Sequence, residues 1–271
     1  MGQKRIGFIG GGNMAEALLK GLLAGGQDPA TITVGEPLTA RRAVLRRRYK
    51  VAAVADNLQV VEQSDIVVLA IKPQHLGVAL AGLRGVVGGR LVVSIVAGAR
   101  LARLEKGLGR GARVVRVMPN TPCLVGRGMS VLCGGKGVRP VDLSRARALF
   151  AAVGSALVVE DEKLMDVVTG LSGSGPAYVY LFAEALMSAG KAAGLDDDMA
   201  RVLACQTLAG AAEMLIASKE SPADLRRAVS SPGGTTVAGL GVLDEAGFKA
   251  GVQAAVKAAT RRSRELGRAK F

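Results

Sequence analysis

An apolar strand, a run of three glycines and a helix follow one another at the start of this 271-residue chain, and this order constrains the fold most strongly. Residues 5–9 are the apolar run, Gly10, Gly11 and Gly12 follow directly, and residues 13–24 carry Ala and Leu at helical spacing. Glycines in such a turn let the backbone turn tightly and approach a ligand, while the unpaired N–H groups of the helix face an anion. The order predicts a βαβ unit that binds the pyrophosphate of a dinucleotide.

Further apolar runs alternate with helical patterns up to about residue 160. The run at 65–71 is apolar at almost every position, as in a parallel strand that is covered on both faces. This alternation predicts an α/β fold with an N-terminal doubly wound parallel sheet of Rossmann type. The expected strands are residues 5–9, 32–34, 65–71, 91–96 and 113–117.

Only helical periodicity continues beyond residue 160. We therefore expect a first domain at residues 1–160 and an all-helical second domain at residues 161–271. Residues 202–216 are apolar on more than one helical face, which indicates that this helix packs against a partner. The expected helices are residues 163–169, 176–193, 197–217, 222–228, 236–246 and 248–267.

The formal net charge of +14 raises the alternative of a nucleic-acid-binding protein. The basic residues are scattered, however, and aromatic residues make up only 3% of the chain, so nothing predicts stacking on bases. We expect no nucleic-acid partner, and interpret the charge as a field that attracts anionic substrates.

Cysteine and histidine are too few and too widely spaced for a metal site or a disulfide framework. The three cysteines are Cys123, Cys133 and Cys205, and the one histidine is His75. The N-terminus lacks the features of a signal peptide, and no run of about 20 apolar residues is free of charge. We expect no metal, no membrane span and a cytoplasmic protein.

The end of the second expected strand gives conflicting signals about the cofactor. Glu36 lies 24 residues after Gly12, where a carboxylate hydrogen-bonds the ribose 2′-hydroxyl of NAD and repels the 2′-phosphate of NADP. Arg41 and Arg42 follow, and they could instead attract that phosphate. An exposed turn residue is the alternative for Glu36. We expect NADH to be accepted at least alongside NADPH.

The third strand ends at Ala70-Ile71-Lys72-Pro73, so Lys72 is expected near the cofactor. A solvated strand-end lysine is the alternative, and His75 is interpreted as a surface or capping residue.

A second glycine-rich segment, SSPGGTT at residues 230–236, precedes an expected helix. Gly233 and Gly234 permit backbone conformations in which successive N–H groups converge on an anion, and Ser231 and Thr236 add hydroxyl groups. The helix start favours a carboxylate. An ordinary Ser/Thr-capped helix start is the alternative.

Several motifs together resemble the pyrroline-5-carboxylate reductase family. They are GFIGGGNM, MPNTP at residues 118–122, GLSGSGPAY at 170–178 and PADLRRAVSSPGGTTVAGLGVL at 222–243, and the resemblance extends from about residue 5 to 266. It implies reduction of 1-pyrroline-5-carboxylate to L-proline with NADPH or NADH. It also implies a helical domain that binds substrate and forms an interlocking homodimer, with five dimers in a decamer in many members.

The resemblance also implies functions for individual residues. The substrate would be held by Ser231, Gly233, Gly234, Thr235 and Thr236, and the Thr236 hydroxyl would hydrogen-bond the ring nitrogen. Glu36 and Ala228 depart from residues common in relatives. The cofactor residues would be Gly10, Gly11, Gly12, Asn13, Met14, Asn57, Ala70, Lys72, Pro73 and Ala97, with Glu36 added from the spacing argument.

Three other functions remain as alternatives. A β-hydroxyacid dehydrogenase shares the two-domain plan, but Lys191 lies about four helical turns beyond the glycine-rich segment that precedes its helix, too far for that family's lysine. A reductase of other cyclic imines fits better. A nucleotide-sensing module would need only the first glycine loop.

Overall fold

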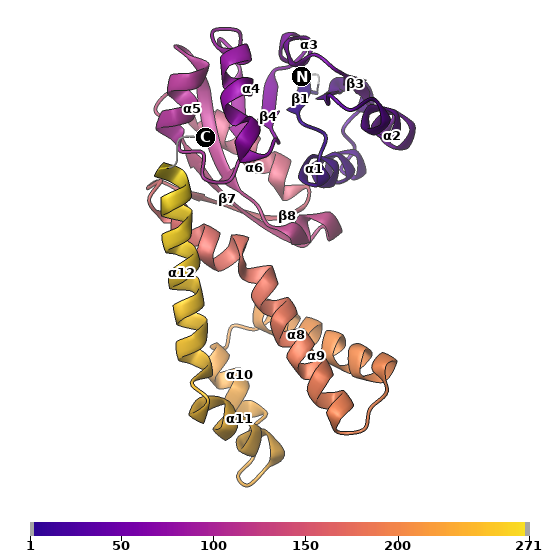
Figure 1. The fold of residues 1–271 in the computed structure, drawn as a ribbon, viewed down its shortest axis with the longest axis vertical. Helices are drawn as coiled ribbons and strands as arrows, with labels where there is room; N and C mark the ends of the chain where they lie inside the picture. The colour runs from indigo at the N-terminus through magenta and orange to yellow at the C-terminus, as the bar shows by residue number, and fades with distance from the viewer. Residues whose placement is uncertain (1–2, 269–271) are drawn as a thin grey trace. The chain divides into compact units, whose positions relative to one another are not determined.

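The computed structural model describes residues 3–268, which form two compact units (Figure 1). The sheet unit comprises residues 3–174 and 258–268, and the helical unit comprises residues 175–257. The chain therefore leaves the sheet unit after Ser174 and returns to it within its last helix.

The sheet unit is built on eight strands in the order β3-β2-β1-β4-β5-β6-β7-β8. Strand β1 lies between β2 and β4, with Ile6 opposite both Ile32 and Ile66, and β1 to β6 pair in parallel. The strand order reverses between β1 and β4, which opens a crevice at their carboxyl ends. The strands are β1 (Ile6–Ile9), β2 (Ile32–Gly35), β3 (Ala52–Val54), β4 (Ile66–Leu69), β5 (Leu91–Ser94), β6 (Arg113–Met118), β7 (Gly128–Gly134) and β8 (Gly154–Val159).

Helices cover both faces of this sheet, so the expected doubly wound fold is confirmed. Alternate strand residues enter two separate cores: Phe8 and Val68 pack with α1 and α6, whereas Ile9 and Leu69 pack with α3, α4 and α5. The helical segments are α1 (Asn13–Ala24), η1 (Pro29–Thr31), α2 (Thr39–Tyr49), α3 (Asn57–Glu62), η2 (Pro73–His75), α4 (Leu76–Leu83), α5 (Leu101–Leu108), η3 (Thr121–Val125) and α6 (Pro140–Ala151).

One pairing departs from the expected parallel sheet, because β7 runs antiparallel to β6. The connection between them, residues 119–127, contains only the short helix η3 and is too short for a crossover onto the same edge. Strand β8 then pairs in parallel with β7 through α6. The sheet is therefore predominantly parallel.

Gly173 allows residues 169–173 to pack closely against the Met118 side chain of the MPNTP segment. After α7 (Leu164–Val168), residues Thr169–Gly173 form a single π-helical turn, η4. A Cβ atom on Gly173 would lie 2.5 Å from the Cε of Met118, and the Asn120 side-chain amide donates to the Ser172 carbonyl at 3.2 Å. The π-helical turn and the MPNTP segment are thus packed and hydrogen-bonded to each other.

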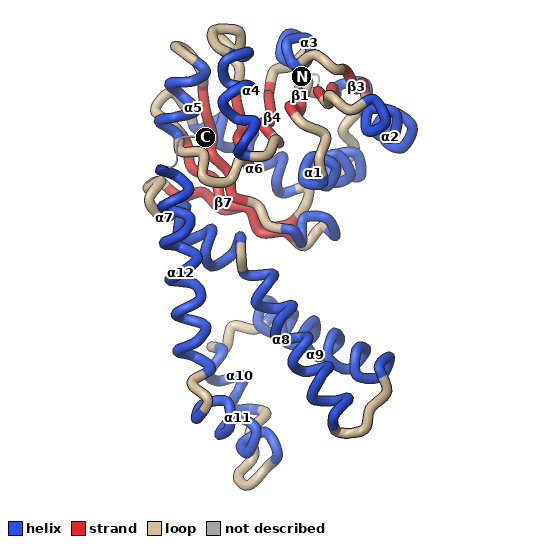
Figure 2. Tube along the Cα trace, viewed as in Figure 1, coloured by secondary structure: helices blue, strands red, loops and turns tan. Residues whose placement is uncertain are grey.

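The helical unit contains helices and loops, and the strands among the described residues all lie in the sheet unit (Figure 2). Helices α8 and α9 pack on each other, and Phe182 of α8 lies 5.8 Å from Phe248 between ring centroids. The helices of the helical unit match the expected ones within about one residue at each end, which is the usual scatter for helix boundaries. They are α8 (Gly175–Ala192), α9 (Asp197–Ala217), α10 (Pro222–Ala228), α11 (Thr235–Glu245) and α12 (Phe248–Arg268), whose last turns enter the sheet unit.

Those last turns of α12 pack on the loop that follows β5. The buried Ser263 hydroxyl donates to Asp166 Oδ1 at 2.7 Å. A Cβ atom on Gly98, whose φ is +73°, would lie 3.4 Å from the Leu266 backbone. Glu162 Oε1 accepts from the Leu101 N–H at 2.7 Å and from buried Arg116 at 2.9 Å. The loop from β5 to α5 is therefore held on two sides.

The cysteines, the candidate metal ligands and the apolar helices are placed as follows. Cys123 and Cys133 are buried free thiols, and Cys205 is exposed. Within residues 3–268, no group of three or more His, Cys, Asp or Glu side chains is arranged to hold a metal ion. In the same range one helix, α9, is long and apolar enough to span a membrane by length and composition alone. One such helix is weak evidence for a span, because an apolar helix in a subunit interface has the same character.

Candidate functional site

A cavity of about 830 Å³ lies at the carboxyl ends of β1, β2 and β4. Ligands bind at this edge of open α/β sheets because the helix N-termini and loops converge there. Apolar surface predominates in its lining, as in most small-molecule sites. The lining residues are Ile9, Gly10, Gly11, Gly12, Gly35, Glu36, Pro37, Leu38, Ala55, Asp56, Asn57, Leu58, Ala70, Ile71, Lys72, His75, Val78, Ala79, Gly82 and Leu83.

The first glycine loop forms one wall, and its geometry fits a phosphate group. Gly10 has φ of +99°, and a Cβ there would lie 2.5 Å from the Ala70 carbonyl oxygen, so the turn requires glycine. Gly12 precedes the first residue of α1, and no side chain caps this helix. A Cβ on Gly12 would meet no atom within 4 Å. The loop thus presents an uncapped helix N-terminus to open space that a pyrophosphate can fill.

Glu36 lies at the carboxyl end of β2 and is only 8% exposed, so it is not an exposed turn residue. Its Oε2 accepts from the Gly11 N–H at 3.1 Å, and its Oε1 accepts from the Leu38 N–H at 3.0 Å. The carboxylate therefore faces the cavity and is oriented by two backbone donors.

Arg41 and Arg42 are both bound to acceptors of the protein. Arg41 donates to the Gly11 carbonyl at 2.7 Å and forms an ion pair with Glu16. Arg42 donates to the Glu36 and Pro37 carbonyls at 2.8 and 2.7 Å. Neither arginine lines the cavity.

Glu16, in the first turn of α1, gathers three donors from α2. Arg41 donates to its Oε2, and its Oε1 accepts from Tyr49 at 2.6 Å and from Arg48 at 2.9 Å. The hydrogen bond from Tyr49, aided by the two arginines, holds the pKa of Glu16 below its ordinary value. Glu16 thus remains ionised at neutral pH and keeps Arg41 beside the glycine loop.

The end of β4 and the helix after it form the opposite wall. Lys72 and His75 are exposed and line the cavity. His75 was expected only as a surface or capping residue, and the apolar lining of Val78, Ala79, Gly82 and Leu83 was not expected at all. These positions recur at helical spacing after His75, which is the one signal in the sequence that could have identified them.

The cavity gathers part of the expected cofactor set. Its lining includes Gly10, Gly11, Gly12, Glu36, Asn57, Ala70 and Lys72. Asn13 and Met14 begin α1, Pro73 begins η2, and Ala97 is exposed in the loop after β5, all outside the lining. The position of Asn57 also requires a glycine at residue 35, since a Cβ atom on Gly35 would lie 2.5 Å from the Asn57 Oδ1.

The second glycine loop lies in the helical unit and has the backbone expected of an anion-binding turn. Gly233 has φ of +69°, and the Gly234 N–H donates to the Ser231 carbonyl at 2.9 Å. Gly234 precedes α11, which no side chain caps, and Thr235 and Thr236 are its first residues. Ser231 and Thr235 are exposed and Thr236 is half-buried.

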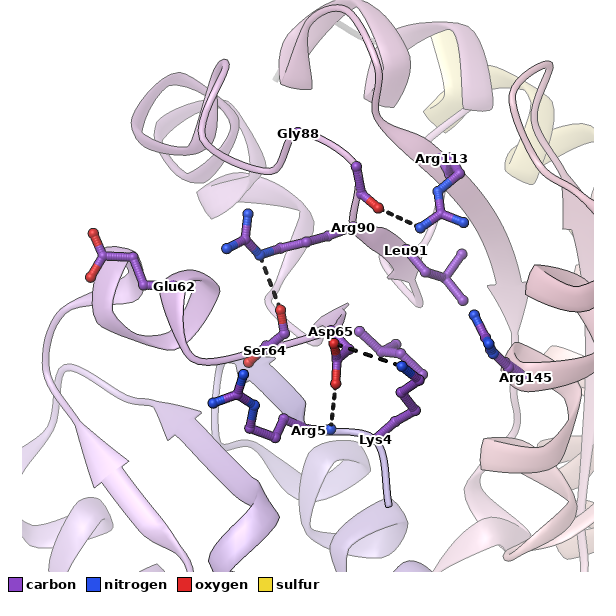
Figure 3. Close-up of a pocket in the computed structure, with 12 residues that line it drawn as sticks. Lys4, Arg5, Glu62, Ser64, Asp65, Gly88, Arg90, Leu91, Arg113 and Arg145 are labelled. Carbon is purple, nitrogen blue, oxygen red and sulfur yellow. Dashed lines mark hydrogen bonds and ion pairs between the residues drawn. The ribbon is translucent and has the colours of Figure 1, made fainter. Parts of the chain in front are cut away.

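A second cavity, of about 360 Å³, lies at the amino ends of the strands, and Figure 3 shows the residues that line it. Its cations are largely bound to the protein: Arg90 Nε donates to the Ser64 carbonyl at 3.0 Å, and Arg113 pairs with Asp142 at 2.6 Å. None of the expected site residues lines it. We therefore assign the functional site to the carboxyl edge.

Both halves of the chain match known families. Residues 162–266 match the model for pyrroline-5-carboxylate reductase dimerisation, and residues 5–98 match the model for NADP oxidoreductase, coenzyme F420-dependent. A pyrroline-5-carboxylate reductase of Synechocystis is 48% identical over 265 residues, covering 97% of this chain and 98% of the relative.

Solved structures agree with this relationship. A pyrroline-5-carboxylate reductase from Coxiella burnetii superposes with a TM-score of 0.94 at 36% identity, covering 99% of this chain and 100% of that one. The Plasmodium falciparum pyrroline carboxylate reductase with NADP bound superposes with a TM-score of 0.89 at 34% identity, covering 98% of this chain and 99% of that one. The sequence motifs, the cavity and these relatives together show that the chain belongs to the pyrroline-5-carboxylate reductase family.

Proposed function

We propose that this protein reduces 1-pyrroline-5-carboxylate to L-proline with hydride from NADPH or NADH, the last step of proline biosynthesis. The observation that carries the proposal is that one chain joins a glycine-loop cavity to helices that match this reductase family. A protein that only senses nucleotides would not need the second half.

The glycine loop and the cavity residues suit a bound dinucleotide. The uncapped start of α1 at Gly12 would hold the pyrophosphate, and Glu36 would hold the ribose of the adenosine. Asn13, Met14, Pro73 and Ala97 complete the proposed set from elements beside the cavity. When bound, the reduced nicotinamide supplies a hydride.

We assign the second glycine loop to the substrate. The Gly233 amide, with the hydroxyl groups of Ser231 and Thr235, would bind the substrate carboxylate, while the Gly234 N–H, which donates to the Ser231 carbonyl, would hold the turn in place. The Thr236 hydroxyl would bind the ring nitrogen. Hydride adds to the imine carbon, and the electron pair of the C=N bond returns to the protonated nitrogen. Because the substrate nitrogen is already protonated, a dedicated proton donor is not required. Orientation of the two bound molecules can lower the barrier by about 7–11 kcal/mol.

We propose a division of labour between residues 1–160, which bind NAD(P), and residues 161–271, which bind substrate and dimerise. The match of residues 162–266 to the dimerisation model supports this boundary. A homodimer, or a decamer of five dimers, in the cytoplasm is the proposed state of the protein. The free thiols suit a reducing compartment.

The test is oxidation of NADH and of NADPH by the purified protein, with and without added 1-pyrroline-5-carboxylate. We expect oxidation only with the imine present, and L-proline in amounts equal to the cofactor consumed. A six-membered cyclic imine carboxylate serves as the comparison substrate. Equal or faster turnover of that compound would favour a broader imine reductase, and no turnover of either imine would overturn the proposal.

A further inference from the structure

We infer that this protein prefers NADH to NADPH, and that Glu36 and Glu16 together set the preference. The inference rests on the proposed cofactor site and concerns the adenosine ribose end of it. NADH carries a 2′-hydroxyl there and NADPH a 2′-phosphate, so the two differ in one group of about two negative charges.

Glu36 provides the acceptor for the hydroxyl. Its carboxylate has about four acceptor positions, and the Gly11 and Leu38 N–H groups occupy one on each oxygen. Each oxygen thus keeps one lone pair for a ribose hydroxyl. Rotation of the carboxylate away from a phosphate would break both of these hydrogen bonds. The residue is also only 8% exposed, which leaves little room for another orientation.

The arginines that could neutralise a 2′-phosphate are engaged elsewhere. Arg42 is held by the Glu36 and Pro37 carbonyls at 2.8 and 2.7 Å and by the Thr39 hydroxyl at 2.9 Å. Arg41 is held by the Gly11 carbonyl at 2.7 Å and by Glu16. Recruiting either guanidinium to the cofactor would break at least two charge-assisted contacts.

Glu16 is the residue that decides where Arg41 stays. Its side chain is 17% exposed and also accepts from Tyr49 and Arg48, so its position on α1 is fixed by three donors. Arg41 is thereby bound between this carboxylate and the glycine loop. A phosphate at the ribose would face the Glu36 carboxylate, while Arg41 is paired with Glu16 and the Arg42 guanidinium is bound by two carbonyls and a hydroxyl. A ribose hydroxyl would instead gain an acceptor.

The experiment compares kcat/KM for NADH and NADPH, with 1-pyrroline-5-carboxylate saturating, and the dissociation constants of NAD⁺ and NADP⁺. In the unmodified protein we expect both measurements to favour the form without the phosphate. In Glu36→Ser the kcat/KM ratio of NADH to NADPH should fall by about tenfold or more, because a charged hydrogen bond to the ribose is lost and a repulsion removed.

Glu16→Gln tests the second carboxylate. Loss of the ion pair frees Arg41, so NADPH should gain relative to NADH, and Arg41→Gln in the same background should abolish that gain. Arg41→Gln alone should change the ratio less than it does in the Glu16→Gln background. The four proteins form a double-mutant cycle that measures the coupling between Glu16 and Arg41. Arg47→Gln removes the same charge from an exposed position of α2 and should leave the ratio unchanged. Thermal unfolding of each variant checks that the fold is retained.

Different outcomes would contradict the proposed reductase function and the proposed preference for NADH. If neither cofactor binds or is oxidised, the proposed function is wrong. If both support turnover but NADPH is used as well as NADH, or if Glu36→Ser leaves the ratio unchanged, the preference is wrong while the reductase assignment remains. A Glu16→Gln ratio equal to that of the unmodified protein would remove Glu16 from the inference.

Discussion

Asp142, on α6, is a carboxylate with no exposed side-chain surface, and three arginines surround it. Arg113 donates to its Oδ1 at 2.6 Å, Arg139 donates to its Oδ2 at 3.0 Å, and Arg145 lies 3.9 Å away. Burial alone would raise its pKa, but the hydrogen bonds from Arg139 and Arg113 outweigh this and lower the pKa to about 2. The ionised form is therefore the one that stabilises the fold.

Asp142→Asn should lower the free energy of unfolding by about 2 kcal/mol at neutral pH. The folded pKa is lower than the unfolded one, so this contribution is present above about pH 4 and is lost as the pH falls towards about 2. Urea unfolding at several pH values measures it. The two proteins should converge at low pH, and a difference independent of pH would contradict the assigned cause.

Thr236→Ala should lower kcat/KM for 1-pyrroline-5-carboxylate by about a hundredfold or less, because one hydrogen bond to a charged partner is lost. Steady-state kinetics with either reduced cofactor measures the change. Thr236→Ser keeps the hydroxyl and should retain most of the activity. If the alanine variant has the kinetics of the unmodified protein, Thr236 has no part in catalysis.

At the scale of elements, polar contacts among the described residues hold the last turns of α12 on the sheet unit. The Ser263 hydroxyl and Asp166 are both buried, and Arg100 lies 3.9 Å from the other carboxylate oxygen. The loop after β5 packs on α12 at Gly98, and at the loop's other end the Leu101 N–H donates to Glu162. Loss of these contacts should therefore loosen both the last turns of α12 and the loop after β5.

Ser263→Ala should lower the free energy of unfolding by about 1–3 kcal/mol, since it removes a buried hydrogen bond to a carboxylate. Hydrogen exchange should also become faster in residues 258–268 and in the loop at 95–100. Arg264→Ala, on the exposed side of the same helix, is the matched control, with an expected change within about 0.5 kcal/mol. Equal effects of the two variants would argue that the Ser263–Asp166 hydrogen bond does not hold α12 on the sheet unit.

At the scale of the whole molecule, the helical unit cannot form a core from one chain. Helices α8, α10 and α11 contain no buried residue, and α9 buries only Ala200 and Ala204. Large apolar side chains such as Val202 and Ile216 are 65% and 81% exposed. Surface of this kind indicates a subunit interface.

Light scattering at micromolar concentration should give at least twice the chain mass of 27.7 kDa. Val202→Glu should shift the protein towards the monomer, because a charge would be buried in the interface. Val125→Glu is the control, since Val125 is 74% exposed but lies in the sheet unit. A monomeric unmodified protein would rule out the dimer.

Much of this protein could be predicted from local pattern. The strands from β1 to β6 except β3, and the helices from α8 to α12, follow from apolar periodicity, and the glycine loop follows from its three consecutive glycines. Strands β3, β7 and β8 were not predicted: β3 has three residues, and β8, although residues 156–159 are apolar, has only half-buried and exposed positions.

The sequence by itself determined the two glycine loops and the positions of most strands and helices along the chain, since these depend on neighbouring residues. Only the tertiary structure decided that β7 reverses against β6 and that Glu36 turns its carboxylate to the Gly11 N–H. It also placed Arg41 between Glu16 and the loop. Such contacts join residues far apart in sequence, and which acceptor a charged side chain binds depends on what the fold brings within hydrogen-bonding distance.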